Sequence, residues 1–271
     1  MAMTTDASSQ KWFDSNAKQL ASWGVDYIKL DYITPGSPAN GVNLPGDESR
    51  EVRMWYNAIK TLRKMITLSI SWKLDRSKKY FDIWRANADS MRVDQDIQTY
   101  KKTPRVSWEN VLRTLKIIWK DISGLTYDQR KSVFIHWIGS SAELNLGDDL
   151  TRPDHQGIAL LTDPDALSAA DFTANYPMQP RNPGSGGNSW KNQNAWISGP
   201  SRSGEFIAVL ANYDKSGSQT IAAKWSDLGV SGTYECFDVF GKSTRKVDSE
   251  LRAELKGFQS VMYRCTTRAY T

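Results

Sequence analysis

A repeated alternation of short apolar runs with longer segments of helical periodicity, over about the first 175 residues, constrains the fold most strongly. Apolar runs at 25–31, 65–72 and 90–93 are predicted strands, and segments 10–22 and 78–88 are predicted helices. Strands that alternate with helices usually pair in parallel through helical crossovers. The pattern therefore predicts an α/β fold with a mostly parallel sheet or barrel.

Further elements extend this alternation. Asp47 is a plausible N-cap for a helix that runs to about residue 64, and Ser107 is a plausible cap for another. Residues 128–140 are predicted to be helical, and 142–146 are a candidate fourth strand. Asp163-Pro-Asp165 is typical of a turn or a helix start.

The pattern of apolar and turn-forming residues changes after residue 175. Residues 176–188 form a Pro/Gly-rich connection, and short alternating runs separated by turn residues follow it. Such spacing fits an antiparallel β-sandwich of about 90 residues. We expect a partial (β/α) barrel domain over 1–178 and a sandwich domain over 179–271. The strand candidates in the second domain are 206–212, 219–223, 232–239 and 260–265.

Composition excludes several classes of partner. The formal net charge of +5 is spread along the chain rather than concentrated on one element, so we expect no nucleic-acid partner. No apolar run approaches the length of a membrane span, so no membrane is expected either. The N-terminus lacks the basic start and apolar core of a signal peptide.

The numbers of histidine and cysteine residues also limit the chemistry that the chain can perform. His136 and His155 are the only two histidines, so neither a zinc cluster nor a His-based triad has much to build on. The acid–base chemistry of an enzyme would therefore have to come from carboxylates. Cys236 and Cys265 could form a disulfide or remain separate buried thiols, and their spacing does not decide between these states.

One strand candidate ends on a charged pair. Lys29 and Asp31 share a face of the segment 23–31, because side chains alternate along a strand, while Asp26 points to the other face. Catalytic groups in barrel and doubly wound enzymes lie at strand ends. The spacing alone fits a catalytic pair and an ordinary surface ion pair equally well.

With these elements in place, the chain resembles the melibiase-type α-galactosidases of glycoside hydrolase family 27, in particular their fungal branch. Residues 23–31 resemble the fourth barrel strand of that family, and Arg92-Val-Asp-Gln-Asp96-Ile97 resembles the Arg-x-x-x-Asp-Ile segment after the sixth strand. Segment 69–72 falls at the end of the fifth strand, and segment 136–150 is similar to the stretch that enters the eighth strand. The C-terminal part resembles the sandwich of the family.

The resemblance implies a retaining glycosidase that hydrolyses terminal α-galactosyl residues without a metal or organic cofactor. Retaining glycosidases use two carboxyl groups about 5–5.5 Å apart, one as nucleophile and one as acid/base. By resemblance, Asp31 is the nucleophile and Asp96 the acid/base. Trp72 could equally pack in the core. The residues expected to contact the sugar are Lys29, Arg92, Ser71 and Trp72.

The chain departs from the family pattern in two places. About 175 residues precede the sandwich, whereas a complete barrel needs about 250, and the first three strands and a seventh-strand segment have no counterpart here. The chain could be a fragment of a longer enzyme, or another chain could complete its barrel. It could also be an inactive paralogue that serves as a carbohydrate-binding or interaction protein. The resemblance implies secretion and an α-galactoside substrate.

Overall fold

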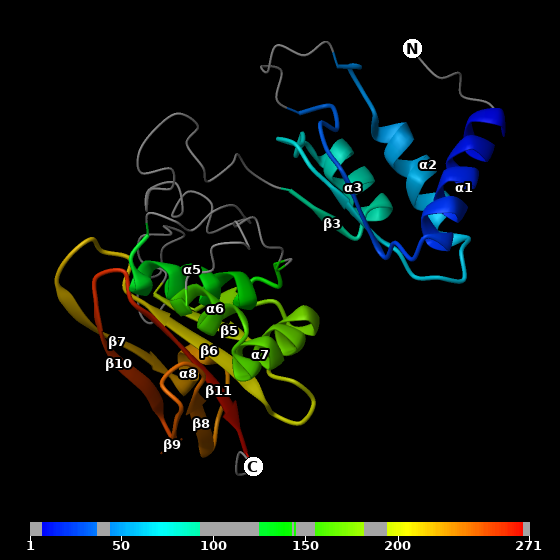
Figure 1. Cartoon of the computed structure of the whole chain (residues 1–271). Helices are drawn as coiled ribbons and strands as arrows, with labels where there is room; N and C mark the ends of the chain where they lie inside the picture. The colour runs from blue at the N-terminus through cyan, green and yellow to red at the C-terminus, as the bar shows by residue number, and fades with distance from the viewer. Residues whose placement is uncertain are drawn as a thin grey trace. The chain divides into compact units, whose positions relative to one another are not determined.

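The computed structural model describes residues 7–36, 44–92, 125–142, 144, 155–181 and 194–267. The chain divides into two compact units, Met1–Gln95 and Asp96–Thr271 (Figure 1). None of the described helices is both long and apolar enough to cross a membrane.

The first unit is a three-stranded parallel sheet with helices in its connections. The strands follow one another in the order β1-β2-β3, which matches their order in the sequence. The predicted strand–helix alternation is therefore confirmed for this unit. Its elements are α1 (Ala7–Ser22), β1 (Tyr27–Leu30), α2 (Ser49–Lys60), β2 (Thr67–Ile70), α3 (Lys78–Asn87) and β3 (Ser90–Met91).

The two faces of this sheet differ in chemistry. Leu30 of β1 and Ile70 of β2 are paired in register and pack into apolar clusters with helix residues such as Val52 and Trp84. The alternate positions are polar, and Lys29 pairs with Ser69 in register. Since period-2 alternation sends every second side chain to the same face, one face carries the core and the other carries the polar residues.

Helix α2 starts later than its sequence predicts. Glu48, rather than Asp47, is the N-cap residue. Asp47 lies one residue before the cap and accepts hydrogen bonds from the Ser49 amide at 2.9 Å and the Tyr80 hydroxyl at 2.7 Å. Burial raises the pKa of Asp47, but hydrogen bonding from the side chain and amide of Ser49 and from Tyr80, together with the charge of Lys79, outweighs it and leaves the pKa below its ordinary value.

In its described residues, the second unit combines helices with antiparallel strands. The predicted helix at 128–140 is confirmed, and Asp163 caps α7, which confirms the helix start at Asp163-Pro-Asp165. The helices are α5 (Tyr127–Gly139), α6 (His155–Leu161), α7 (Pro164–Asn175) and the short α8 (Trp225–Leu228). The strands are β4 (Gln179–Pro180), β5 (Ala195–Ser198), β6 (Phe206–Ala211), β7 (Ser218–Lys224), β8 (Tyr234–Asp238), β9 (Ser243–Val247), β10 (Glu250–Lys256) and β11 (Ser260–Thr266).

Six of these strands form one antiparallel sheet in the order β4-β5-β6-β11-β8-β9, and β10 pairs with β7 in a separate two-stranded sheet. Along β6, Phe206 packs towards residues of β7 and β10, whereas Ile207 packs against residues of α5 and α7. Both faces of the central strands are therefore covered, and every residue of β6 is buried. Figure 1 shows α5, α6 and α7 gathered beside this sheet.

Cys236 and Cys265 form a disulfide. They occupy directly opposed positions on β8 and β11, with their Cα atoms 4.1 Å apart. Both side chains are fully buried in the apolar cluster between the two sheets. The structure therefore decides between the two states that the sequence left open.

Three sequence predictions remain untested. The helix capped by Ser107 and most of the candidate strand at 142–146 lie outside the described residues. The boundary between catalytic and sandwich domains at residue 178 also stays a prediction. Helices α5 and α7, which lie before that boundary, share an apolar cluster with strands β6 and β11, which lie after it.

Candidate functional site

The candidate site lies at the carboxyl ends of the three parallel strands. Asp31 directly follows β1, Ser71 follows β2 and Arg92 follows β3. The register Leu30–Ile70–Met91 places these three residues at adjacent positions, one residue beyond the last printed pairs. Backbone hydrogen bonds continue the ladder there, from the Ser71 amide to the Leu30 carbonyl at 2.7 Å and from the Arg92 amide to the Ile70 carbonyl at 2.8 Å.

Lys29 lies two residues before Asp31 and therefore on the same face of the sheet. Both side chains are exposed within the described structure, whereas Arg92 is half-buried. A carboxylate and two cationic side chains thus belong to one polar face of three neighbouring strands. Such a face suits a ligand rich in hydroxyl groups, because cations donate hydrogen bonds and the carboxylate accepts them.

Ser71 differs from its neighbours in its burial. Its side chain is 1% exposed, and among the described residues its Oγ has no hydrogen-bond partner. A buried hydroxyl without a partner costs about 1–3 kcal/mol relative to a satisfied one. The hydroxyl is therefore available to a ligand atom or to a water molecule on this face of the sheet.

Trp72 has two kinds of neighbours. It packs partly against the apolar cluster that contains Ile70 and Trp84, which agrees with the core-packing interpretation. It also stacks on Tyr32, with ring centroids 4.4 Å apart and an interplanar angle of 22°. Tyr32 was not predicted from the sequence as a site residue, although its place directly after a strand-end carboxylate could have indicated it.

The loop that follows Asp31 is closed by Thr34 and Glu48. The Glu48 amide donates to the Thr34 carbonyl at 2.9 Å, and the Thr34 amide and hydroxyl donate to Glu48 Oε2 at 3.2 and 3.3 Å. Burial raises the pKa of Glu48, and the hydrogen bonds from Thr34 offset only part of that effect. These contacts hold the two ends of the loop together next to Asp31.

Asp96, the predicted acid/base, lies outside the described residues. The pairing of the Asp31 and Asp96 carboxyl groups therefore stays a prediction. The structure brings the other predicted site residues together in the first unit. In the part of the chain that the structure describes, no group of three or more His, Cys, Asp or Glu residues could hold a metal ion.

His136 belongs to the core of the second unit. Its side chain is 1% exposed, with Nδ1 2.7 Å from the Ser132 carbonyl oxygen and Nε2 2.6 Å from the Tyr213 hydroxyl. The Trp196 indole N–H donates to the same hydroxyl at 2.9 Å. These contacts satisfy both ring nitrogens, so His136 has a structural role.

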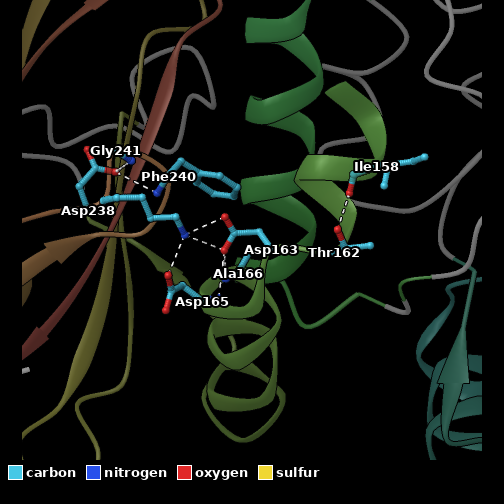
Figure 2. Close-up of polar contacts among 9 residues, drawn as sticks. Ile158, Thr162, Asp163, Asp165, Ala166, Asp238, Phe240 and Gly241 are labelled. Carbon is cyan, nitrogen blue, oxygen red and sulfur yellow. Dashed lines mark hydrogen bonds and ion pairs between the residues drawn. The ribbon is translucent and has the colours of Figure 1, made fainter. Parts of the chain in front are cut away.

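A polar contact also joins α7 to the turn between β8 and β9. Lys242 Nζ lies 2.7 Å from Asp163 Oδ2 and 2.7 Å from Asp165 Oδ2. Asp238 accepts hydrogen bonds from the amides of Phe240 and Gly241 and shapes that turn (Figure 2). The contact is structural, since all of its charges are paired within the second unit.

Known proteins share the sequence and the fold of this chain. Residues 191–265 match the family described as "Alpha galactosidase C-terminal beta sandwich domain". The chain is 38% identical to α-galactosidase 3 of Hypocrea jecorina, over 89% of this chain and 45% of that protein. It is 33% identical to a putative α-galactosidase 8 of Emericella nidulans, over 78% of this chain and 50% of that protein. The chain thus spans about half the length of these curated relatives.

Solved structures extend the similarity of fold to nearly the whole chain. The β-L-arabinopyranosidase of glycoside hydrolase family 27 from Geobacillus stearothermophilus superposes with a TM-score of 0.69 at 20% identity, covering 98% of this chain and 63% of that one. The α-galactosidase I of Mortierella vinacea gives a TM-score of 0.69 at 15% identity, covering 94% and 71%. These similarities confirm the expected fold class, an incomplete TIM-type (β/α) barrel followed by a C-terminal antiparallel β-sandwich. Residues 191–265 thus match the α-galactosidase C-terminal sandwich, and the chain as a whole is similar in sequence and fold to the melibiase-type α-galactosidases of glycoside hydrolase family 27.

Proposed function

We propose that the protein acts as a retaining glycoside hydrolase on terminal α-galactosyl residues of oligosaccharides or glycans. The alignment of Asp31, Ser71 and Arg92 at the ends of three adjacent parallel strands carries this proposal. The names of the curated relatives point to the same substrate class. The reaction needs only side chains of the protein and water.

In the proposed mechanism, the Asp31 carboxylate attacks the anomeric carbon while Asp96 protonates the glycosidic oxygen. The bond to the leaving group breaks, and a galactosyl ester forms on Asp31. Asp96 then removes a proton from water, which attacks the ester and releases galactose with its original anomeric configuration. Lys29, Arg92 and Ser71 would hydrogen-bond the sugar hydroxyls, and Trp72 would contact its apolar face.

We also propose that the protein is secreted and that its catalytic domain ends near residue 178. The disulfide between Cys236 and Cys265 supports secretion, because disulfides persist mainly in oxidising compartments. The matched sandwich family at 191–265 is compatible with the domain boundary. A segment from outside this chain, or a second chain, would supply the remaining barrel strands.

Hydrolysis of 4-nitrophenyl α-galactoside by the purified chain tests the proposed activity. We expect turnover by the parent and a loss of about 10³-fold or more in Asp31→Asn. Asp26→Asn is the matched control, because Asp26 is exposed just before β1, at the other end of the strand. Parent-level turnover in Asp31→Asn would refute the nucleophile. Absence of turnover in the parent, with retained binding of galactose, would favour the carbohydrate-binding alternative.

A further inference from the structure

Tyr32 is an extra residue at the end of the pairing between β1 and β2. The Ser71 amide bonds to the Leu30 carbonyl, but the Ser71 carbonyl accepts from the Ile33 amide at 3.1 Å instead of from Tyr32. The Tyr32 amide donates to Asp31 Oδ1 at 3.0 Å. Regular parallel pairing would use the amide of residue 32, so Tyr32 forms a bulge in the ladder.

The bulge places the Tyr32 ring against Trp72. Tyr32 has φ 61° and Trp72 has φ 133°, values that non-glycine residues rarely adopt. Such backbone conformations persist where surrounding contacts hold them, and they concentrate at functional sites. The stacked rings, 4.4 Å apart, provide such a contact. Tyr32 remains 43% exposed, so a large part of its ring is open to a ligand.

The order of residues along the strands gives this pair a position in the proposed site. Lys29 and Ser69 form one layer, and Asp31 and Ser71 form the next layer towards the carboxyl end. Tyr32 and Trp72 follow one residue later in each chain segment. A sugar that reacts at Asp31 would place its hydroxyls among the earlier layers. Its leaving group would then point away from them, towards the later residues.

We propose that the Tyr32 ring, backed by the stacked Trp72 ring, forms an aromatic platform that binds the leaving-group sugar of the substrate. The inference rests on the proposed function of Asp31. The negative face of an aromatic ring attracts the weakly positive C–H bonds on the apolar face of a pyranose. The platform therefore favours substrates whose galactosyl residue is linked to another sugar.

The test compares two substrates that share the galactosyl group. α-Galactosyl fluoride releases a leaving group without a ring, whereas galactosyl-α-1,6-glucose releases a sugar. We expect Tyr32→Ala to lower the ratio of kcat/KM on the disaccharide to kcat/KM on the fluoride by about tenfold. Tyr32→Phe keeps the ring and should keep the ratio. Tyr127→Ala removes a comparably exposed tyrosine, 41% against 43%, and should also keep the ratio.

An unchanged ratio in Tyr32→Ala would overturn the platform, as would an equal loss in Tyr32→Phe and Tyr32→Ala. Failure of the parent to hydrolyse α-galactosyl fluoride would instead refute the proposed function. In that case, saturation-transfer NMR with the disaccharide tests the platform directly. Saturation transfer to the glucose protons in the parent, and its loss in Tyr32→Ala, would support the platform. The same or no saturation in parent and variant would overturn it.

Discussion

The Tyr213 hydroxyl lies 2.6 Å from His136 Nε2, inside the contact between helix α5 and the end of strand β6. The Ser132 carbonyl can only accept, so His136 Nδ1 carries the proton and Nε2 accepts from Tyr213. Trp196 completes the chain by donating to the tyrosine oxygen. Three side chains from α5, β5 and the end of β6 are thereby joined by hydrogen bonds that need a neutral imidazole.

We predict that this network makes the protein sensitive to acid. Burial lowers the pKa of His136 to about 4, whereas an unfolded chain takes up that proton near pH 6.5. The stabilisation is therefore present above pH 6.5 and is lost as the pH falls to about 4. The loss in the free energy of unfolding is about 3 kcal/mol. Urea denaturation at several pH values measures how the free energy of unfolding depends on pH. In His136→Gln, the slope of that dependence between about pH 4 and 6.5 should be smaller. An unchanged slope in the variant would contradict the assignment.

Tyr213→Phe should destabilise the second unit by about 1–3 kcal/mol. The variant keeps the ring but removes the buried hydroxyl that donates to His136 Nε2 and accepts from the Trp196 N–H. Tyr127→Phe is the control, because Tyr127 is 41% exposed, and its change should stay within about 0.5 kcal/mol. Thermal unfolding followed by circular dichroism compares the two. Equal melting temperatures would show that the hydroxyl of Tyr213 contributes nothing.

Asp163→Ala should cost more stability than Asp165→Ala. Asp163 accepts from the amides of Asp165 and Ala166 as the N-cap of α7 and also pairs with Lys242, whereas Asp165 contributes the ion pair alone. We expect about 1–2 kcal/mol for the first variant and less than about 1 kcal/mol for the second. Denaturant titration at low and high salt separates capping from ion pairing. A larger loss in Asp165→Ala would contradict this interpretation.

Removal of the disulfide should destabilise the sandwich by about 3–4 kcal/mol, because Cys236 and Cys265 close a loop with a sequence separation of 29. The Cys236→Ala/Cys265→Ala variant avoids free thiols and isolates the cross-link. Guanidinium denaturation of parent and variant, with and without reductant, measures the effect. Reductant should shift the midpoint of the parent only. A variant as stable as the oxidised parent would contradict the prediction.

The strands differ in how far their sequences predict them. The run at β6 is visible because all six residues are apolar, but its burial on both faces depends on helices from earlier in the chain. Strand β9 escaped prediction because Ser-Thr-Arg-Lys-Val has no apolar alternation. Strand β10 alternates Leu251, Ala253 and Leu255, yet its Glu, Leu, Arg and Lys residues favour helices. Pairing with β7 decides its conformation.

The candidate site was partly predictable for a physical reason. Lys29 and Asp31 lie two positions apart along a strand, so local geometry places them on the same face. Tyr32 was not predicted, because its position depends on a bulge that only the pairing with Ser71 reveals. The disulfide likewise depends on the register of β8 and β11 rather than on the spacing of its cysteines.

Chemical rescue tests the central claim, that Asp31 is the nucleophile, most directly. Asp31→Gly would be incubated with 4-nitrophenyl α-galactoside and sodium azide, and the product identified by NMR. Azide in the space of the missing carboxylate attacks the face opposite the leaving group, so the account predicts β-galactosyl azide and restored release of nitrophenol. Formation of α-galactosyl azide, or no rescue by azide in a variant of an active parent, would contradict the claim.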